Sequence, residues 1–390
     1  MKTAWHRLAV VIAAVTAAAS TAQAPAPTPV DDAQRRAILA LGPWPVARGN
    51  DPSNRVSGNA NAVALGSALF VDARLSRDGT QACSSCHRPE AAFTDGRPHP
   101  RGTGTLGRNT TTLLNLRGQR WYGWDGANDN LWAQSLRPLL DAQEMGGDVK
   151  HIADVVRGDA NLRGRYVAVF GRAPPADDEV VAIDVAKALA AYQETLVTGR
   201  TSFDGFRDAL ARGDADALAR YPAAARRGLV IFIGTGRCTT CHGGPKFSND
   251  EFGDVGIAYF VAPGQVDAGR HEGIRRLKAS RYNLLGAFND DPARSTATGT
   301  RYVALEHRNF GEFKVPSLRN VARTAPYMHN GSVATLRDVV RHYSELDENR
   351  LHADGERILQ PLGLSASEMD DLVAFLESLS DSPPEAARNP

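Results

Sequence analysis

The sequence lacks the features that mark nucleic-acid-binding, membrane-spanning and disulfide-rich proteins. Its 45 basic and 44 acidic residues give a formal net charge of +1. With no basic stretch either, nucleic acid is not expected as a partner. After the first 24 residues, no stretch approaches the roughly 18 apolar residues that a membrane span needs. Only four cysteines occur in 390 residues, and none lies near the N-terminus, so a lipoprotein anchor is not expected either.

The N-terminus has the pattern of an export signal. Lys2 and Arg7 supply positive charge, residues 8–19 are apolar, and the small residues at 22–24 form a cleavage site. The apolar run is short for a bilayer span, although an uncleaved membrane anchor is the alternative interpretation. We expect residues 1–24 to be a signal peptide that is removed on export to the periplasm, leaving no membrane anchor.

All four cysteines belong to two copies of one motif. The copies are Cys83-Ser-Ser-Cys86-His87 and Cys238-Thr-Thr-Cys241-His242. C-x-x-C-H is the attachment signal for haem c, in which two thiols form thioethers and the adjacent histidine is placed to ligate iron. Because every cysteine is used in this way, the sequence predicts two covalent haem c groups.

Three other interpretations of the cysteines were considered. The pairs of a structural zinc site usually lie within about 20 residues of each other, and these motifs are much farther apart. A thioredoxin-like redox pair would need one motif and no following histidine. Two local disulfides, the usual expectation for an exported protein, would leave both histidines unexplained.

The sequence around the motif is repeated as well. A G-x-x-x-F segment precedes each copy, at 66–70 and at 228–232, and Phe93 and Phe247 follow. A repeat of this kind indicates two related units. We therefore expect a mainly α chain with two cytochrome c-like domains, each wrapped around its haem.

The length favours two domains, which we place at residues 25–205 and 206–390. The polar, Gly/Asp-rich stretch 201–219 marks the boundary. Residues 251–309 have many Gly, Asp and Pro and little periodicity, which predicts long loops around the second haem. Apolar spacing and capping residues predict helices at 61–71, 180–197, 222–233, 335–344 and 365–379.

Further motifs follow one another in order along the chain. They are Phe93-Thr-Asp-Gly, Arg108-Asn109-Thr, Trp124-Asp-Gly, the segment 138–145, Pro316-Ser-Leu-Arg-Asn, and Pro326-Tyr-Met-His-Asn-Gly. With the paired haem motifs, they resemble the bacterial dihaem cytochrome c peroxidase family, including its MauG branch. The resemblance covers nearly the whole mature chain. It implies that hydrogen peroxide binds at the N-terminal haem and that the C-terminal haem is a six-coordinate electron relay.

The resemblance implies roles for residues at the first haem. His87 would be its proximal ligand, and Gln134, Pro138 and Glu144 would line its distal pocket. Cleavage of the O–O bond needs a proton moved between the two oxygens, which Glu144 could do as a general acid and base. Gln134 could hydrogen-bond the bound oxygen. The alternative for Glu144 is a solvated loop carboxylate.

The resemblance also implies two features between the haems. Trp124 matches a tryptophan that carries electron holes, although core packing is the ordinary role of an isolated tryptophan. Asn109, Thr324 and Pro326 match a calcium site, the last two through backbone carbonyls, and all-oxygen ligation suits that cation. A structural loop without a cation is the alternative. We interpret Trp121 and Trp132 as packing residues.

At the second haem the sequence departs from ordinary peroxidases of the family. These use a methionine as sixth iron ligand, and the matching position here is Tyr343, as in MauG-type proteins. Met328 lies in a turn, and Met369 on the final helix is expected to pack in the core. His342 lies about 100° around the helix from Tyr343, so both cannot face the iron. A phenolate is a hard anionic donor and would lower the haem potential. A buried core tyrosine is the alternative.

Two further departures concern the first haem and the route out of the protein. Many members have a histidine that blocks the peroxide haem, but Arg101 occupies the matching position and the nearest histidine is His99. The first haem is therefore predicted to be open at rest. Gly236 stands where MauG has a tryptophan for hole transfer to its partner, so any exit route must differ.

Three functions remain open at this point. The preferred one is a MauG-type enzyme that uses peroxide to oxidise a residue, typically tryptophan, of a periplasmic partner protein. The second is a conventional peroxidase that reduces hydrogen peroxide with electrons from a small cytochrome or cupredoxin. The third is a dihaem electron carrier, which would have both irons saturated by strong ligands.

Overall fold

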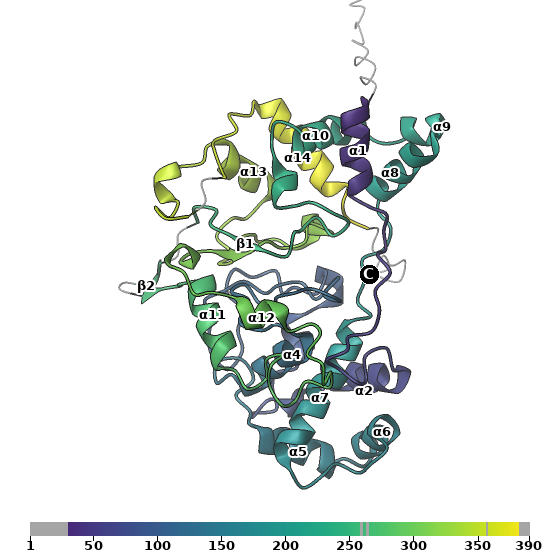
Figure 1. The fold of residues 1–390 in the computed structure, drawn as a ribbon, viewed down its shortest axis with the longest axis vertical. Helices are drawn as coiled ribbons and strands as arrows, with labels where there is room; N and C mark the ends of the chain where they lie inside the picture. The colour runs from purple at the N-terminus through teal and green to yellow at the C-terminus, as the bar shows by residue number, and fades with distance from the viewer. Residues whose placement is uncertain (1–29, 258–259, 263–264, 356–357, 382–390) are drawn as a thin grey trace, which may run out of the picture.

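The protein has a mainly helical fold with little sheet, as predicted (Figure 1). The computed structural model describes residues 30–257, 260–262, 265–355 and 358–381. The export signal predicted at residues 1–24 lies outside this part of the chain. None of the described helices has both the length and the apolar character that crossing a bilayer requires.

The elements divide into two groups along the chain. The helices up to residue 193 are α1 (Asp32–Ala40), α2 (Ala60–Phe70), α3 (Cys83–Cys86), α4 (Leu131–Leu140), α5 (Val149–Gly158), α6 (Ala160–Phe170) and α7 (Asp178–Gln193). Those that follow are α8 (Ser202–Arg212), α9 (Ala215–Ala219), α10 (Ala223–Ile233), α11 (Arg270–Ala279), α12 (Thr298–Tyr302), α13 (Leu336–Ser344) and α14 (Ala366–Glu377). The short antiparallel strand pairs are β1 (Phe252–Gly253) with β4 (Phe313–Lys314), and β2 (Phe260–Ala262) with β3 (Gln265–Val266).

The structure confirms the predicted helices, with small shifts at their ends. Asn59 caps α2, Thr335 caps α13, and Ser365 forms a capping box with Glu368 at the start of α14. α10 begins directly after Pro222, where its helix was predicted. The helix predicted at 180–197 is α7, which begins two residues earlier and ends at Gln193.

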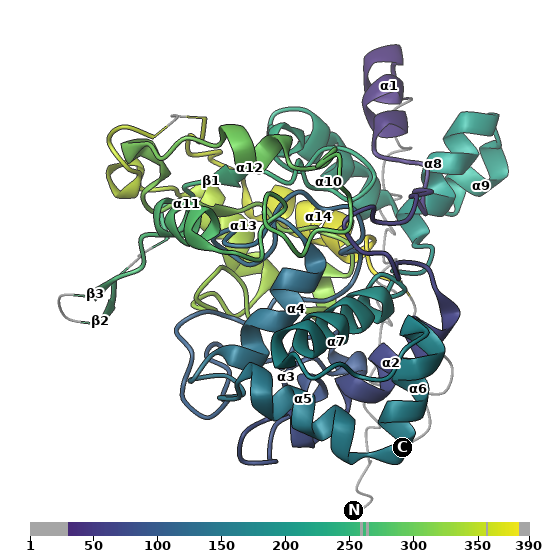
Figure 2. The ribbon, with the colours of Figure 1, turned by 60° about the horizontal axis from the view of Figure 1, so that its bottom comes forward.

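Helix α7 is the centre of the first half, and α2, α4 and α5 pack around it (Figure 2). Most of its residues are buried, including small ones that let neighbouring helices approach. Trp132 on α4 is completely buried in the same core, together with Leu136 and Leu139. This packing fixes the direction of α4, whose other residues reach the candidate site.

The repeated glycine lets two helices cross closely in each half. A Cβ on Gly66 of α2 would lie 2.1 Å from the carbonyl oxygen of Ala188 on α7. A Cβ on Gly228 of α10 would lie 1.9 Å from the carbonyl oxygen of Asp371 on α14. Because these neighbours are backbone atoms, a side chain at either position would force the helices apart.

The repeated phenylalanines also have matching contacts. Phe70 at the end of α2 meets Phe93 edge-on, with ring centroids 6.4 Å apart, and Phe232 on α10 meets Phe247 in the same way at 6.1 Å. Edge-to-face aromatic pairs at these distances stabilise a core beyond the area they bury. The sequence repeat is therefore a repeat of packing, with each haem motif lying between its two phenylalanines along the chain.

The second core gathers residues from both ends of the chain. Ile38 and Leu41 at α1 pack with Phe232 on α10 and Phe375 on α14. α1 therefore contacts α8 and α10 rather than the helices around α7 (Figure 1). The domain boundary at residue 205 stays a prediction, but the N-terminal helix clearly packs into the second core.

Residues 201–219, whose polar composition predicted a boundary segment, form the helices α8 and α9. Phe203, Phe206 and Leu210 are buried in the second core. Their spacing of three and four residues places them on one face of α8, and Thr201 caps the helix. Polar residues on the opposite face gave the stretch its linker-like composition.

The prediction that residues 251–309 form loops around the second haem was wrong for the part from 270 to 302. This part contains α11 and α12, and it packs on the first half. Asp129 accepts hydrogen bonds from the backbone of Leu284 and the hydroxyl of Thr300. Lys187 on α7 donates to the carbonyl of Phe288 and pairs with Asp290 at 2.6 Å. These polar contacts join segments more than 100 residues apart, which local periodicity could not show.

Candidate functional site

Both histidines of the Cys-x-x-Cys-His motifs are held in the same way. Nδ1 of His87 lies 3.0 Å from the carbonyl oxygen of Phe93, and Nδ1 of His242 lies 2.9 Å from that of Phe247. Both phenylalanines have positive φ, 59° and 53°, which is uncommon for such residues and turns the chain back to the imidazole. When Nδ1–H donates to a carbonyl, Nε2 is left as the nitrogen that can ligate a metal.

The electrostatic setting of these histidines favours the neutral form. Desolvation lowers the pKa of both His87 and His242, and a metal-ligating imidazole must be unprotonated. The neighbouring thiols are not joined as disulfides. Desolvation raises the pKa of Cys83 to about 12 and that of Cys86 to about 11. The first motif thus presents two protonated thiols beside a neutral imidazole, the donor set that haem c attachment requires.

A large cavity lined by residues of both halves brings most of the predicted site residues together. Its volume is about 1120 Å³, somewhat above the roughly 300–1,000 Å³ of ordinary ligand pockets. A porphyrin-sized group needs this room. The predicted residues that line it are Cys83, Cys86, His87, Asn109, Trp124, Gln134, Pro138, Glu144, Thr324 and Pro326.

Helix α4 supplies the wall that carries Gln134 and Pro138. Asn130 caps the helix by accepting a hydrogen bond from the Ala133 backbone. The two residues are four apart, so they lie on one face of the helix, one turn from each other. Gln134 Oε1 accepts a hydrogen bond of 2.8 Å from the Asn128 side chain, which leaves its amide N–H groups to face a ligand.

Glu144 lies on the turn that follows α4. Its carboxylate is 18% exposed and pairs with Arg137 at 2.7 Å. Glu144 is therefore a mostly enclosed carboxylate on the cavity wall, and its role in the reaction stays a prediction.

The loop that contains Arg101 is bound to this same turn. Thr103 N–H donates to the Glu144 carbonyl and Gly104 N–H to that of Gln143, both at 2.9 Å. A Cβ on Gly102 would lie 2.4 Å from the Glu144 carbonyl oxygen, so only glycine permits this approach. Arg101 is exposed, whereas His99 contributes to the cavity lining. The open resting state of the first haem stays a prediction.

Trp124 joins the two halves of the chain at the cavity wall. Its indole N–H donates to the Asn109 carbonyl at 2.8 Å, and its own carbonyl accepts from the backbone of Lys314 on β4. The packing role predicted for the other two tryptophans is confirmed. Trp132 is completely buried, and Trp121 is buried beneath the Arg270 guanidinium, 4.2 Å from its ring.

The three predicted calcium ligands all line the cavity. Asn109 donates through Nδ2 to the carbonyl of Arg97, so Oδ1 is the atom that its side chain can offer a cation. Thr324 and Pro326 flank Ala325 in the loop after the short helix η5 (Val321–Arg323). An amide oxygen and two backbone carbonyl oxygens are the donor types that a hard cation prefers.

Tyr343 lies beside the second haem motif. Desolvation raises the pKa of its phenol, and the nearby thiols of Cys238 and Cys241 add to the shift. The adjacent His342 faces away, since its Nε2 lies 2.7 Å from the Val255 carbonyl oxygen. Met369 packs against the second core, as predicted.

Two features at the seam between the halves were not singled out by the sequence. Arg108 pairs with Asp125 and with Asp267, each at 2.7 Å, and lowers the pKa of both carboxyls. His329 stacks on Phe313 with ring centroids 3.5 Å apart, and its Nε2 finds no hydrogen-bond partner among the described residues. Burial lowers the pKa of His329 to about 4. The sequence could have drawn attention to Arg108 and His329 only because each lies in a motif shared with the family. Their contacts join distant segments and leave no local pattern in the sequence.

Comparison with known proteins gives a consistent result. The family described as di-haem cytochrome c peroxidase matches residues 60–212. The methylamine utilization protein MauG of Methylorubrum extorquens is 34% identical over 82% of this chain and 78% of its own length. Cytochrome-c peroxidase IdrP1 of Denitromonas iodatirespirans is 33% identical over 97% of this chain and 93% of its own. The crystal structure of a MauG-like protein associated with microbial copper homeostasis has a TM-score of 0.66 and 28% identity, covering 87% of this chain and 96% of that one.

Two cytochrome c-like units, a repeated histidine geometry and relatives that match over most of their length all point the same way. The relatives are named as peroxidases or as MauG, which supports an enzyme rather than the electron carrier considered above. This chain belongs to the di-haem cytochrome c peroxidase family and is a peroxidase-type oxidoreductase with two haem cofactors.

Proposed function

We propose that this chain is a periplasmic enzyme of the MauG type, which uses hydrogen peroxide at the first haem to oxidise a residue, typically a tryptophan, of a partner protein. The observation that carries this choice is Tyr343, which lies beside Cys238 and Cys241 where ordinary members supply a methionine. A phenolate donor lowers the potential of its iron and favours oxidised states that a soft thioether would disfavour.

At the first haem, the enclosed side chains act on the peroxide. The bound haem supplies the redox chemistry, attached through Cys83 and Cys86 and ligated by His87. Glu144, held by Arg137 at 2.7 Å, takes the proton from the inner peroxide oxygen and returns it to the outer one, so that water leaves. Gln134 would donate its amide N–H to the peroxide without competing for the proton, since its Oε1 already accepts from Asn128.

The remaining wall residues exclude water and fix distances. Pro138 places an apolar ring one turn along α4 from Gln134. Trp124 is tied to Asn109 and Lys314, so its indole is held between the halves. There it would carry oxidising equivalents toward the second haem, which Cys238, Cys241 and His242 would hold.

We also propose a calcium ion between the haems. Asn109 Oδ1 and the carbonyl oxygens of Thr324 and Pro326 would be its protein ligands, with water completing the shell. This ion would connect the segment that positions Trp124 to the loop after η5. Removing it with a chelator should change the haem spectra without releasing the covalent haems.

A conventional cytochrome c peroxidase is the second candidate. It is favoured by IdrP1, a relative named as a cytochrome-c peroxidase that matches 97% of this chain. The two candidates share the first haem site and differ in what refills the oxidised protein. They are separated by comparing turnover with a reduced small cytochrome against mass shifts on a partner protein encoded nearby.

Variants at the second haem test the proposal directly. Tyr343→Phe removes the phenol oxygen, so the low-spin spectrum should change and oxidation of the partner should stop. The matched control is His342→Gln, the adjacent side chain whose ring is tied to Val255; it should leave both unchanged. If Tyr343→Phe leaves the low-spin spectrum as it was, the ligand assignment is wrong. Full turnover with the reduced cytochrome and no mass shift on the partner would favour the conventional peroxidase.

A further inference from the structure

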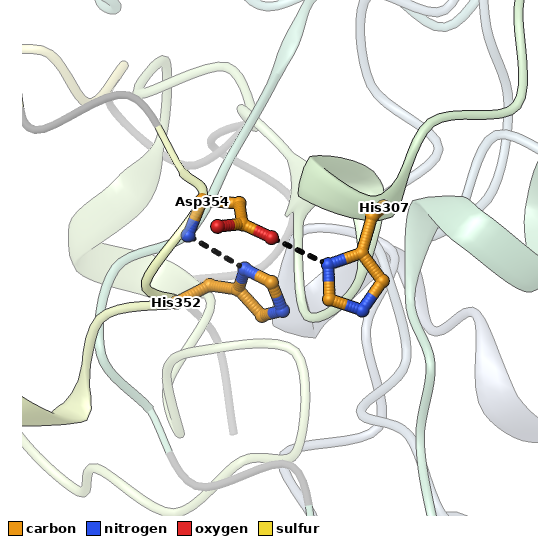
Figure 3. Close-up of side chains that lie close together, drawn as sticks. All are labelled: His307, His352 and Asp354. Carbon is orange, nitrogen blue, oxygen red and sulfur yellow. Dashed lines mark hydrogen bonds and ion pairs between the residues drawn. The ribbon is translucent and has the colours of Figure 1, made fainter.

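Two histidines and an aspartate lie together in the second half, at residues that neither haem uses (Figure 3). His307 begins the short helix η4 (His307–Asn309), which comes before β4. His352 and Asp354 lie on the turn that follows η6 (Glu348–Arg350), beyond α13. The fold thus brings together two segments about 45 residues apart and places three metal-binding side chains at their junction.

The three side chains face one another. Nδ1 of His307 lies 2.7 Å from Oδ2 of Asp354, and the backbone N–H of Asp354 points to Nδ1 of His352 at 3.2 Å. The two imidazole rings are 5.0 Å apart between centroids. One possible ligand atom from each residue lies within 4.8 Å of the others. Figure 3 shows the Asp354 carboxylate above the two rings, with one oxygen directed at the His307 ring.

The turn that carries His352 and Asp354 is held by hydrogen bonds to its backbone. Oδ2 of Asp254 accepts a hydrogen bond of 2.6 Å from the backbone N–H of His352, and its other oxygen accepts one from Gly256. The ring of Phe310 packs beside His352, with centroids 6.2 Å apart. Because backbone contacts hold the turn, the side chains of His352 and Asp354 remain available to a ligand.

We infer that His307, His352 and Asp354 form a binding site for a divalent transition metal of the zinc and copper class. Two imidazole nitrogens and one carboxylate oxygen are the donors that such ions prefer, whereas calcium and magnesium select oxygen alone. The ion takes the place of the hydrogen bond between His307 Nδ1 and Asp354 Oδ2. Water fills the remaining positions, since the His307 and Asp354 side chains are 75% and 61% exposed.

Only small movements are needed to close the site. Ligands bound at about 2.1 Å in tetrahedral geometry lie roughly 3.4 Å apart, somewhat closer than the 4.8 Å limit within which these atoms lie. The exposed side chains can rotate by that amount, and the 3.2 Å contact to His352 Nδ1 is a weak one to give up. The bound ion would fasten the turn after α13, the helix of Tyr343, to the segment before β4.

The test is zinc binding to the haem-loaded protein after chelation. Excess calcium is added back to fill oxygen-rich sites, and zinc per chain is measured by equilibrium dialysis and elemental analysis. We expect one tightly bound zinc. Loss of an outer-shell partner already weakens metal binding by about 10–100-fold, so His352→Ala and Asp354→Ala should each weaken it by at least tenfold.

His271→Ala is the matched control, because this histidine packs near Phe310, with ring centroids 6.0 Å apart, but is not one of the three ligands. It should bind zinc as the unchanged protein does. Unaltered haem absorbance in all three variants shows that the fold is intact. The inference is overturned if the unchanged protein binds no stoichiometric zinc, or if His352→Ala and Asp354→Ala bind it as tightly as His271→Ala. Neither result depends on the peroxide reaction.

Discussion

In the first half α2 crosses α7 at Gly66, and in the second half α10 crosses α14 at Gly228. Each crossing leads into a haem motif whose histidine turns to a phenylalanine carbonyl five or six residues on. On the opposite side the halves differ. The first has a cavity walled by α4, with Gln134 among its lining residues, and the second has the tyrosine helix α13. We infer that the repeated helix crossing and motif bind the haem in each half. The parts that are not repeated, α4 and α13, would then determine what each haem does.

The difference is sharpest at the residues that face the haems. Glu144 can exchange a proton, but its carboxylate is already paired with Arg137 and is therefore a poor candidate for an iron ligand. Tyr343 can bind iron through its oxygen, but desolvation raises its pKa, so the phenol needs a metal to lose its proton near neutral pH. The proposed function therefore assigns peroxide chemistry to one half and the storage of oxidising equivalents to the other.

The largest expected effect comes from removing the proton carrier of the first half. Glu144→Gln keeps the shape but cannot shuttle a proton, so the reaction with peroxide should slow by about 10²–10⁴-fold. Stopped-flow absorbance of the first haem measures it, with haem content unchanged. Glu90→Gln, a change at an exposed glutamate near the motif, should react at the normal rate. A rate for Glu144→Gln within twofold of normal would remove Glu144 from the mechanism.

Within the second half, a buried ion pair should matter far more to stability than an exposed one. Arg319 and Asp204 are almost completely buried and 2.9 Å apart. Arg319→Leu leaves the carboxylate without its charge partner and should cost about 3–5 kcal/mol. Hydrogen exchange in α8 and α10 reports that loss separately from the first half. Arg227→Leu, which breaks the more exposed pair with Asp371, should cost at most about 1 kcal/mol. Equal costs for the two variants would contradict this ranking.

The seam between the halves should weaken in acid because of His329. Its folded pKa of about 4 lies below the ordinary 6.5, so the unfolded chain takes up the proton first as the pH falls. Stability is therefore complete above pH 6.5 and is lost progressively down to pH 4, by up to about 3 kcal/mol. Urea unfolding at pH 7 and pH 5 measures the loss. His329→Gln should flatten this part of the profile, and an unchanged slope would show that His329 is not its source.

A smaller effect is expected where the loop of Arg101 meets the turn of Glu144. Gly102→Ala places a methyl group 2.4 Å from the Glu144 carbonyl oxygen, which should cost about 1–3 kcal/mol. It should also slow the peroxide reaction while leaving the second haem spectrum unchanged. Gly107→Ala, where an added Cβ would meet nothing within 4 Å, is the control. A change at the second haem in Gly102→Ala would show that the halves are not independent.

The local part of each site could be predicted from the sequence. The Cys-x-x-Cys-His motifs and the capping residues of α13 and α14 depend on neighbours a few residues away, and the structure confirms the two helices and their caps. The grouping of Gln134, Pro138 and Glu144 also follows from one helix and the turn after it. The resemblance to a known family identified these residues before any contact was visible.

The long-range part could not be predicted. Ile38 joins the second core across more than 150 residues, and Asp129 binds a segment near residue 300. Neither contact leaves a periodic pattern. The sequence around a single carboxylate or one apolar helical turn is the same whichever distant segment it contacts. The metal-binding cluster of His307 and Asp354 was missed for the same reason.

Electron paramagnetic resonance of the resting, haem-loaded protein tests the central claim. This claim is that both haems have the same proximal histidine arrangement but different residues on the opposite face. An open first haem and a tyrosine-ligated second haem predict one high-spin and one low-spin ferric signal in equal amounts. Two low-spin signals would contradict the account, since they would mean that a strong ligand closes the face on which peroxide must bind.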